Sequence, residues 1–378
     1  MSALRLAIAA VLAASPVAAS AGTFLDVGME NPSVITHPDN YNGTGGQRTV
    51  NVCLDPAALP APDGTPENDD PEQAIRNAVA EFNRNLGVPG NVVDGVSVGV
   101  PFGRPDFESV AMHELGHCMG LDHNVLGPSE VFELGGCDGD PETATPSCGS
   151  QAARDMRYFT NSFNGIDEAM NLNAGVDTER GSRDDLRGDD VNRHWFRSNG
   201  NNPFEVPPAT IDRGTYSNLL TALPAGHFFA EAATSFDPCG NPSSDTSTLR
   251  SQLPTSAVMF PVLCTNNVVR QTSWDDVTTL RLAQAGNDGD DGTADDYTIQ
   301  LAYIGKTTTG CDITSQFTSG PGFAFCEVGV TLNSTENNVR ITSGTAEFEI
   351  AVDWFFNQTD STGAAGGGPD DIFDDGFE

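Results

Sequence analysis

Three histidines and a glutamate stand at a spacing that suits metal chemistry. His113 and His117 are four residues apart, and residues four apart share one face of an α-helix, so both imidazoles can reach one ion. Glu114 stands beside the first histidine, where its carboxylate can act as the base for a water molecule at that ion. The third candidate ligand is His123. The pattern therefore predicts a catalytic zinc site.

Gly120 separates the first two histidines from the third. Glycine adopts a left-handed backbone at little cost, so it can end the helix and turn the chain back toward the ion. His123 then supplies a third nitrogen, and three nitrogen ligands leave the fourth zinc position for water. The alternative is that these are ordinary surface or core histidines that share one helix.

The segment His113–His123 has the form HExxHxxGxxH and resembles the metzincin zinc peptidases, in particular their matrixin-like branch. The resemblance implies that the three histidines bind catalytic zinc and that Glu114 polarises the attacking water. It also implies a methionine turn beneath the metal. Residues 256–261 (SAVMFP) resemble that turn, with Met259 as its methionine and with Phe260 and Pro261 as walls of the pocket for the substrate side chain after the cut bond.

The methionine turn stands farther from the histidines than in matrixins, because residues 124–255 intervene. Met170 is an alternative methionine, but Met259 is favoured by the proline and the capped helix that follow it. Trp274–Val277 resembles the start of the matrixin C-terminal helix, in which Asp275 or Asp276 would brace the turn through hydrogen bonds. Helix capping explains Asp276 equally well.

Hydrophobic periodicity and capping residues predict the elements that position these side chains. Residues 49–54 alternate and predict a strand, and Asp70 followed by Pro71 predicts the start of a helix. Residues 96–100 (VSVGV) predict a second strand, an edge that we expect to pair with extended substrate. Asp106 predicts the N-terminus of the helix that bears the histidines.

The last third of the chain changes from helical to strand periodicity. Ser273 and Asp276 predict a capping box for a helix that Gly286 ends. Apolar residues then alternate with polar ones from Tyr297 to Tyr303 and again toward Val352, which predicts strands. With the resemblance, these patterns predict an α/β fold: a metzincin-like catalytic domain with a twisted mixed sheet, an active-site helix and a C-terminal helix.

Composition divides the chain into four parts. Residues 1–21 read as a secretory signal peptide, with Arg5 before a short apolar run and small residues at the cleavage site. We expect the catalytic domain at 22–286, with a large loop-rich insertion at 124–255. A small β-rich module is expected at 287–358, and an acidic, glycine-rich tail at 359–378.

The charge balance excludes some partners. The formal net charge is -35, from 18 basic and 53 acidic side chains, so phosphates would be repelled and a nucleic-acid partner is excluded. No stretch after the signal is long and apolar enough to span a membrane. We expect a secreted or cell-surface monomer that acts on a protein or peptide.

The eight cysteines suit export, because disulfides form in oxidising compartments. Sequence does not fix their pairing, but short loops favour Cys137–Cys148, Cys239–Cys264 and Cys311–Cys326, which leaves Cys53 with Cys118.

An acidic loop after the capped helix is a candidate calcium site, because closely spaced carboxylates among glycines offer oxygen ligands to a hard cation. Its candidate ligands are Asp288, Asp290, Asp291, Asp295 and Asp296. The loop lacks the spacing of an EF-hand, and a solvated acidic linker is an equal alternative.

The sequence thus predicts a secreted zinc endopeptidase that uses a glutamate base. The alternative is a non-catalytic binding or adhesion protein on a metzincin scaffold. The presence of Glu114 favours the enzyme, since a pure binder has no use for a base beside an open metal position.

Overall fold

The computed structural model describes residues 23–25, 35–60, 70–88, 90–122, 195–196, 216–217, 228–229, 256–260, 266–290, 292–320, 323–333 and 338–361. Several predicted features lie outside these residues, namely the signal segment, most of the insertion and the end of the tail. Individual residues that also lie outside are His123, Met170, Pro261, Asp291, Cys137, Cys148, Cys239 and Cys264.

The described residues form three α-helices, α1 (Glu72–Arg84), α2 (Phe107–Cys118) and α5 (Trp274–Gln284), and two short 3-10 helices, η2 (Pro56–Ala58) and η4 (Gly95–Val98). The predicted caps of α2 and α5 are confirmed, whereas α1 has Pro71 as its N-cap, one residue after the predicted Asp70, whose carboxylate accepts from the Glu72 N–H at 3.0 Å. The Asp106 carboxylate accepts a hydrogen bond from the Ser109 backbone N–H, and Ser273 and Asp276 form a reciprocal capping box. These local contacts satisfy backbone donors that a helix start otherwise leaves unpaired.

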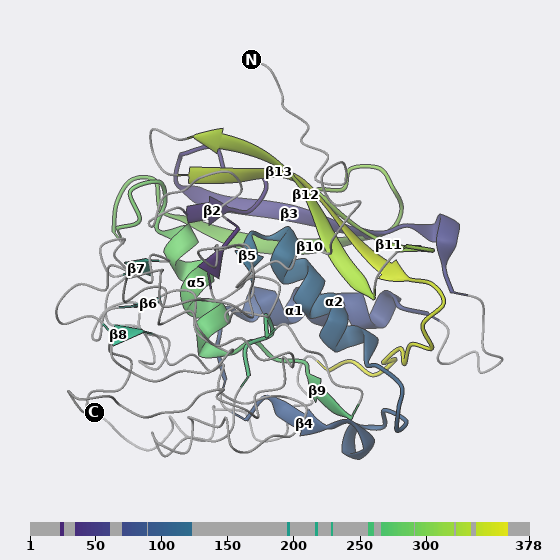
Figure 1. Cartoon of the computed structure of the whole chain (residues 1–378). Coiled ribbons are helices and arrows are strands. Elements are labelled where there is room, and N and C mark those ends of the chain that lie inside the picture. Colours follow the sequence, from purple (N-terminus) through teal and green to yellow (C-terminus); the bar gives the residue numbers. More distant parts are fainter. Residues whose placement is uncertain are drawn as a thin grey trace, which may run out of the picture.

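One mainly parallel sheet forms the centre of the fold (Figure 1). Its path runs β10-β3-β11-β13-β12, and β2 also pairs with β13. All pairs are parallel except β12 with β13, so the sheet is mixed, as predicted. The strands are β2 (Ile35–His37), β3 (Gly46–Leu54), β10 (Tyr297–Lys306), β11 (Ile313–Thr318), β12 (Ala324–Asn333) and β13 (Asn338–Glu349).

The strands predicted to form an appended β module complete this central sheet. The β3 strand lies between β10 and β11, so segments from both ends of the chain share one hydrogen-bonded ladder. Their alternation confirms the strand prediction, but the sheet that they join contains β3, which precedes both α1 and α2 in the chain. The helix bearing the histidines, α2, packs on β12 and β13, which both follow it in the sequence.

The predicted strand at 96–100 is wrong. Residues 95–98 form η4, and the strand lies just before it, at β4 (Val92–Asp94), paired antiparallel with β9 (Asn267–Val269). Two other small sheets join β1 (Thr23–Phe24) to β5 (Leu121–Asp122), and β6 (Trp195–Phe196) to β7 (Tyr216–Ser217) and β8 (Phe228–Phe229). The Val96 side chain is 58% exposed, so the apolar alternation did not reflect a buried face.

The core lies between the central sheet and the helices α1 and α2, which pack on each other (Figure 1). Phe107, in the first turn of α2, is completely buried and contacts four aromatic rings: Phe317, Phe348, Trp354 and Phe356. Aromatic packing of this kind fixes the start of α2 against strands β11 and β13.

Within the described residues, two disulfides join Cys53 to Cys311 and Cys118 to Cys326. The expected pairs Cys53–Cys118 and Cys311–Cys326 are therefore wrong. The short-loop assumption failed because strands far apart in sequence lie side by side in the sheet. The bridges indicate an oxidising compartment. Among the described helices, none is long and apolar enough to cross a membrane.

Candidate metal centre

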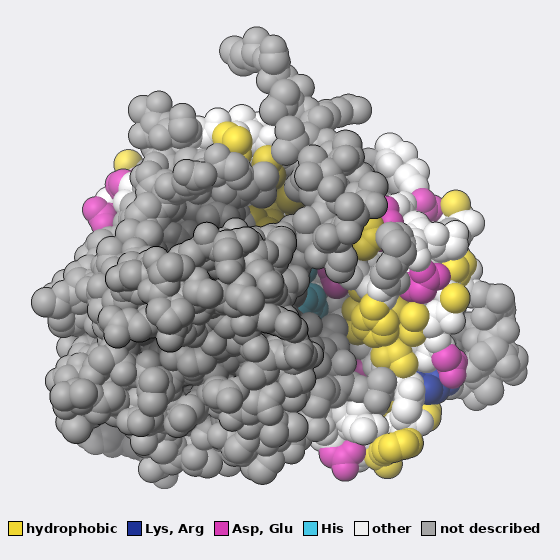
Figure 2. Space-filling view, viewed as in Figure 1, with side chains coloured by type: hydrophobic (Ala, Val, Ile, Leu, Met, Phe, Trp, Pro, Cys, Tyr) yellow, Lys and Arg dark blue, Asp and Glu magenta, His cyan; other side chains and the backbone are white. Residues whose placement is uncertain are grey.

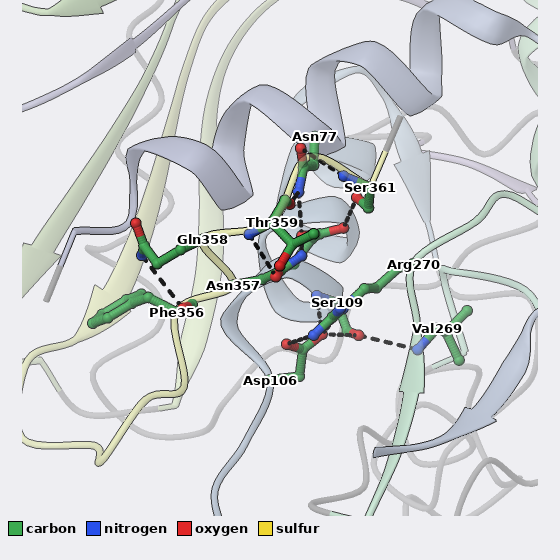
Figure 3. A network of polar contacts seen from close by, with 11 residues as sticks. Asn77, Asp106, Ser109, Val269, Arg270, Phe356, Asn357, Gln358, Thr359 and Ser361 are labelled. Atoms are coloured by element: carbon green, nitrogen blue, oxygen red, sulfur yellow. Dashed lines mark hydrogen bonds and ion pairs between the residues drawn. The ribbon is translucent and has the colours of Figure 1, made fainter. Parts of the chain in front are cut away.

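The N-terminus of α2 is anchored by a buried ion pair. Arg270 donates two hydrogen bonds to Asp106, from Nε to Oδ2 at 2.9 Å and from Nη2 to Oδ1 at 2.7 Å. The same carboxylate accepts from the backbone N–H and the hydroxyl of Ser109, whose Oγ in turn accepts from Val269 (Figure 3). Asp106 thus caps α2 and, through Ser109 and Arg270, ties the helix to β9, which follows the turn around Met259.

Glu108, also in the first turn of α2, ties the helix to α1 and to the C-terminal segment. Its Oε2 accepts from the side-chain amides of Asn77 and Asn357, each at 2.7 Å, and its Oε1 accepts from the Ser361 hydroxyl at 2.7 Å. Burial raises the pKa of Glu108, and the nearby Arg270 guanidinium offsets part of that effect. Figure 3 shows the C-terminal segment that carries Asn357 and Ser361 lying between α1 and α2.

His113 and His117 lie on one face of α2, as their spacing predicts. The two Nε2 atoms are 3.1 Å apart. Two imidazoles bound to one tetrahedral zinc would place these atoms about 3.3 Å apart, given zinc–nitrogen bonds of 2.0–2.1 Å. Figure 2 shows histidine and acidic side chains meeting near the centre of one face of the molecule.

Backbone carbonyls fix the orientation and the tautomer of both rings. The Nδ1 of His113 lies 2.7 Å from the Val258 carbonyl oxygen, and that of His117 lies 2.9 Å from the Leu121 carbonyl oxygen. A carbonyl only accepts, so each Nδ1 carries the proton and each Nε2 presents a lone pair. Burial lowers the pKa of His113 to about 4 and that of His117 to about 3, so both rings are neutral at pH 7. Neutral, oriented imidazoles are the form that binds a metal.

The turn at residues 256–260 is held under these histidines by Asp276. Its carboxylate accepts hydrogen bonds from the backbone N–H groups of Val258 at 3.0 Å and Met259 at 3.4 Å. The same group accepts from the Ser273 N–H and hydroxyl. The two explanations offered by the sequence, turn bracing and helix capping, are therefore both right for Asp276.

Met259 packs against α2 at Gly116. A Cβ placed on Gly116 would lie 2.2 Å from the Met259 sulfur, which no real contact permits. Glycine at this helix position therefore lets the methionine lie beneath the histidine face. Both Met259 and Phe260 are buried. The Gly120 φ of +97° confirms the expected left-handed turn after the helix.

Glu114 is buried beside the histidine pair. Among the described residues its Oε2 atom has no hydrogen-bond partner, and burial raises the pKa of the carboxyl to about 8. An unpartnered buried oxygen is costly, and a cation beside it would offset that cost. Two neutral imidazoles next to this carboxyl group have the chemistry that a divalent metal requires, and His123 is the further ligand that the sequence predicts.

His123 lies outside the described residues, as does Pro261 of the predicted pocket wall. Within the described part of the chain, no three histidine, cysteine, aspartate or glutamate side chains form a group that could hold a metal ion. The structure therefore brings together two predicted ligands, the predicted base and the predicted methionine, and leaves the third ligand a prediction.

In the predicted calcium loop, Asp288 and Asp290 are exposed and Asp295 and Asp296 are half-buried, and these carboxylates accept mainly from groups of the loop itself. Asp295 accepts from the Asn287 N–H at 2.6 Å, and Asp296 accepts from the Gly292 N–H at 2.6 Å. The Thr293 hydroxyl lies within hydrogen-bond distance of Asp288, Asp295 and Asp296.

Sequence reasoning missed the carbonyls of Val258 and Leu121, which orient the imidazoles, because a backbone group leaves no mark in residue type. It also missed Glu108 and the C-terminal residues that it binds. A carboxylate next to Phe107 within a largely apolar helix was the available signal, since a buried charge requires partners.

Comparisons with protein-family models, with curated proteins and with solved structures found no match for this chain. Its function therefore has to be inferred from the residues and their geometry. The geometry offers two neutral, oriented imidazoles next to a buried carboxyl group with an unpartnered oxygen.

Proposed function

We propose that this protein is a secreted zinc-dependent endopeptidase. The observation that carries the proposal is the pair of Nε2 atoms 3.1 Å apart, each on a ring whose Nδ1 faces a backbone carbonyl, beside the buried Glu114. The metzincin resemblance of the HExxHxxGxxH segment supports the same proposal.

The ligands would be His113, His117 and His123, since imidazole nitrogens suit zinc. When bound, zinc supplies Lewis acidity that activates water and polarises a carbonyl group. Glu114 accepts a proton from the attacking water and then delivers it to the leaving amine. Asp276 and Val258 hold His113 in position, because the same turn binds the carboxylate and accepts from the imidazole.

We propose β12 as the strand with which an extended substrate pairs, in place of the 96–100 segment. Among the described strands, β12 pairs with β13 alone, so its other edge offers backbone donors and acceptors. The Cys118–Cys326 bridge holds this edge strand beside the metal helix. Pairing along a strand edge binds the peptide backbone and leaves side chains to set specificity.

The experiment is cleavage of unfolded casein, with products identified by mass spectrometry, before and after treatment with 1,10-phenanthroline. We expect internal peptide bonds to be cut, and we expect the chelator to stop cleavage and added zinc to restore it. Backbone N-methylation of a cleaved peptide at single positions would locate the pairing with β12, as loss of cleavage at alternate residues.

The alternative, a binding or adhesion protein, predicts a different result. It would bind zinc and leave casein and a diverse peptide library intact at every enzyme concentration. That outcome, with zinc bound in the expected ratio, would overturn the peptidase proposal.

A further inference from the structure

The two residues that flank His117 fasten the end of α2 on opposite sides. On one side, Gly116 packs directly on the sulfur of Met259. On the other, Cys118 is completely buried and covalently bound to Cys326 of β12. The ring of His117 is therefore carried by a helical turn that is clamped between the methionine turn and the sheet.

The sheet side of this clamp has a second contact. Cys326 pairs with Ala346 in the ladder between β12 and β13, and Gly344 of β13 lies under the end of the helix. A Cβ on Gly344 would lie 3.1 Å from Cys118 Cβ and 3.2 Å from its sulfur. A side chain at position 344 would therefore crowd Cys118, so a displacement of β13 toward α2 would also move Cys118.

We propose that the Cys118–Cys326 disulfide is a positioning device for the metal centre. It sets where His117 lies relative to His113 and where the edge strand β12 lies relative to both. This inference rests on the proposed function, because it concerns the same histidines. It adds that metal affinity and substrate binding depend on a bond from Cys118, within the HExxHxxGxxH segment, to Cys326 of the edge strand β12.

Removal of a bridge that only stabilises the fold would lower thermal stability without changing zinc affinity. The Cys53–Cys311 bridge is a matched control for this comparison. Cys53–Cys311 joins β3 of the same sheet to the turn before β11 and forms no covalent bond to α2. The two bridges close loops of similar length, with sequence separations of 258 and 208 residues. Loop entropy depends on the logarithm of length, so their removal relaxes the unfolded chain by nearly the same amount.

The test compares the double variants C118A/C326A and C53A/C311A with the parent chain. Zinc affinity is measured by competition with a chromogenic chelator, and thermal unfolding is measured on the same samples. We expect similar losses of thermal stability. Zinc affinity should fall about 10-fold or more in C118A/C326A alone, as when groups that orient metal ligands are removed. Equal zinc affinities in the two variants would overturn the proposal.

A single variant covers the case in which C118A/C326A does not fold. G344A keeps both bridges and pushes on Cys118 through the 3.1 Å contact. We expect it to fold, to retain both disulfides by mass spectrometry, and to bind zinc about threefold more weakly or worse, within the range for outer-shell changes. Unchanged zinc affinity in a folded G344A chain would also overturn the proposal.

Zinc affinity separates this proposal from the peptidase proposal. If C118A/C326A loses zinc affinity while the parent chain cuts no peptide, the positioning role stands and the peptidase assignment fails. If the parent chain cuts peptides and both double variants keep its zinc affinity and its KM, the enzyme assignment stands and the positioning role fails.

Discussion

The acidic side chains around α2 and those of the loop at 287–296 differ in what surrounds them. Glu108, Glu114 and Asp276 are each less than 5% exposed, whereas Asp288 and Asp290 are exposed on the loop. Each buried carboxylate either accepts several hydrogen bonds from distant segments or, in Glu114, has an unpartnered oxygen. Asp288 and Asp296 of the loop instead accept from backbone groups a few residues away, although Asp295 also accepts from the distant Tyr41 hydroxyl.

Carboxylate clusters of similar appearance in sequence are therefore not equivalent in what they can do. A buried acid is costly to hold and persists where it positions or reacts with something. An exposed acid bound by its own loop contributes little energy that depends on the rest of the fold. We expect substitutions of the first group to change function or stability strongly and those of the second group to change little.

The largest expected effect is that of Glu114→Gln on peptide cleavage. Removing the base should lower kcat about 1,000-fold, within the usual range for general acid–base groups. Zinc affinity should stay within about threefold, because Glu114 is not a predicted ligand. The matched control is Asp288→Asn, which should cleave at the parental rate. Parental activity in Glu114→Gln would show that the wrong base has been assigned.

Asp276→Asn should have the next largest effect. Its carboxylate faces N–H donors from Val258, Met259 and Ser273, and the amide NH2 of asparagine would face some of them. We expect the free energy of unfolding to fall by about 3 kcal/mol, as for a broken buried hydrogen-bond network. Zinc affinity should fall 10-fold or more, since the turn orients His113.

Urea unfolding with and without zinc measures both effects of Asp276→Asn. The control is Asp290→Asn in the exposed loop, which should change the free energy of unfolding by less than about 0.5 kcal/mol. Equal changes in the free energy of unfolding for Asp276→Asn and Asp290→Asn would contradict the expectation that buried acids matter more than exposed ones.

Glu108 should make stability depend on pH in an unusual direction. Burial raises its pKa above the ordinary value of 4.5, so the folded chain holds this proton more tightly than the unfolded chain. Its stabilising contribution is present below about pH 4.5 and is lost as pH rises through the raised folded pKa. The unfolding free energy of the parent chain minus that of Glu108→Gln should therefore fall as pH rises from about 4.5 through the raised pKa of Glu108. Urea unfolding of both chains from pH 4 to pH 8 measures this difference. A difference that does not change with pH would contradict the raised pKa of Glu108.

The smallest expected effect is that of calcium removal. The loop oxygens of Asp295 and Asp296 already accept from Asn287, Gly292 and Thr293. Chelation of calcium at fixed free zinc should leave Tm unchanged within about 1 °C, because no ion-binding energy is then lost. Differential scanning fluorimetry measures Tm, and a fall of several degrees would establish a stabilising calcium site.

The features that sequence predicted correctly are local ones. The caps Asp106 and Ser273 act on backbone groups within three residues, and the spacing of His113 and His117 fixes their common helix face. The approach of Met259 to Gly116 was a non-local expectation that came from the resemblance. The third ligand and the zinc ion itself stay predictions, because His123 lies outside the described residues.

The features that sequence missed depend on which segments lie side by side. Short loops favoured a Cys311–Cys326 bridge, yet these cysteines bind Cys53 and Cys118, because β11 lies beside β3 and β12 lies beside α2. The strands after α5 were expected to form a separate module. Alternation of apolar and polar residues indicates which face of a strand is buried, but it does not indicate which strand lies beside it.

By itself, the sequence determined the helix that bears His113 and His117 and the cap at its start, because helix periodicity and capping act over a few residues. Tertiary structure alone decided how the His113 imidazole is oriented and which strand α2 is covalently bound to. The Val258 carbonyl and the Cys326 sulfur belong to chain segments more than a hundred residues from the α2 residues that they contact, and no local pattern encodes that pairing.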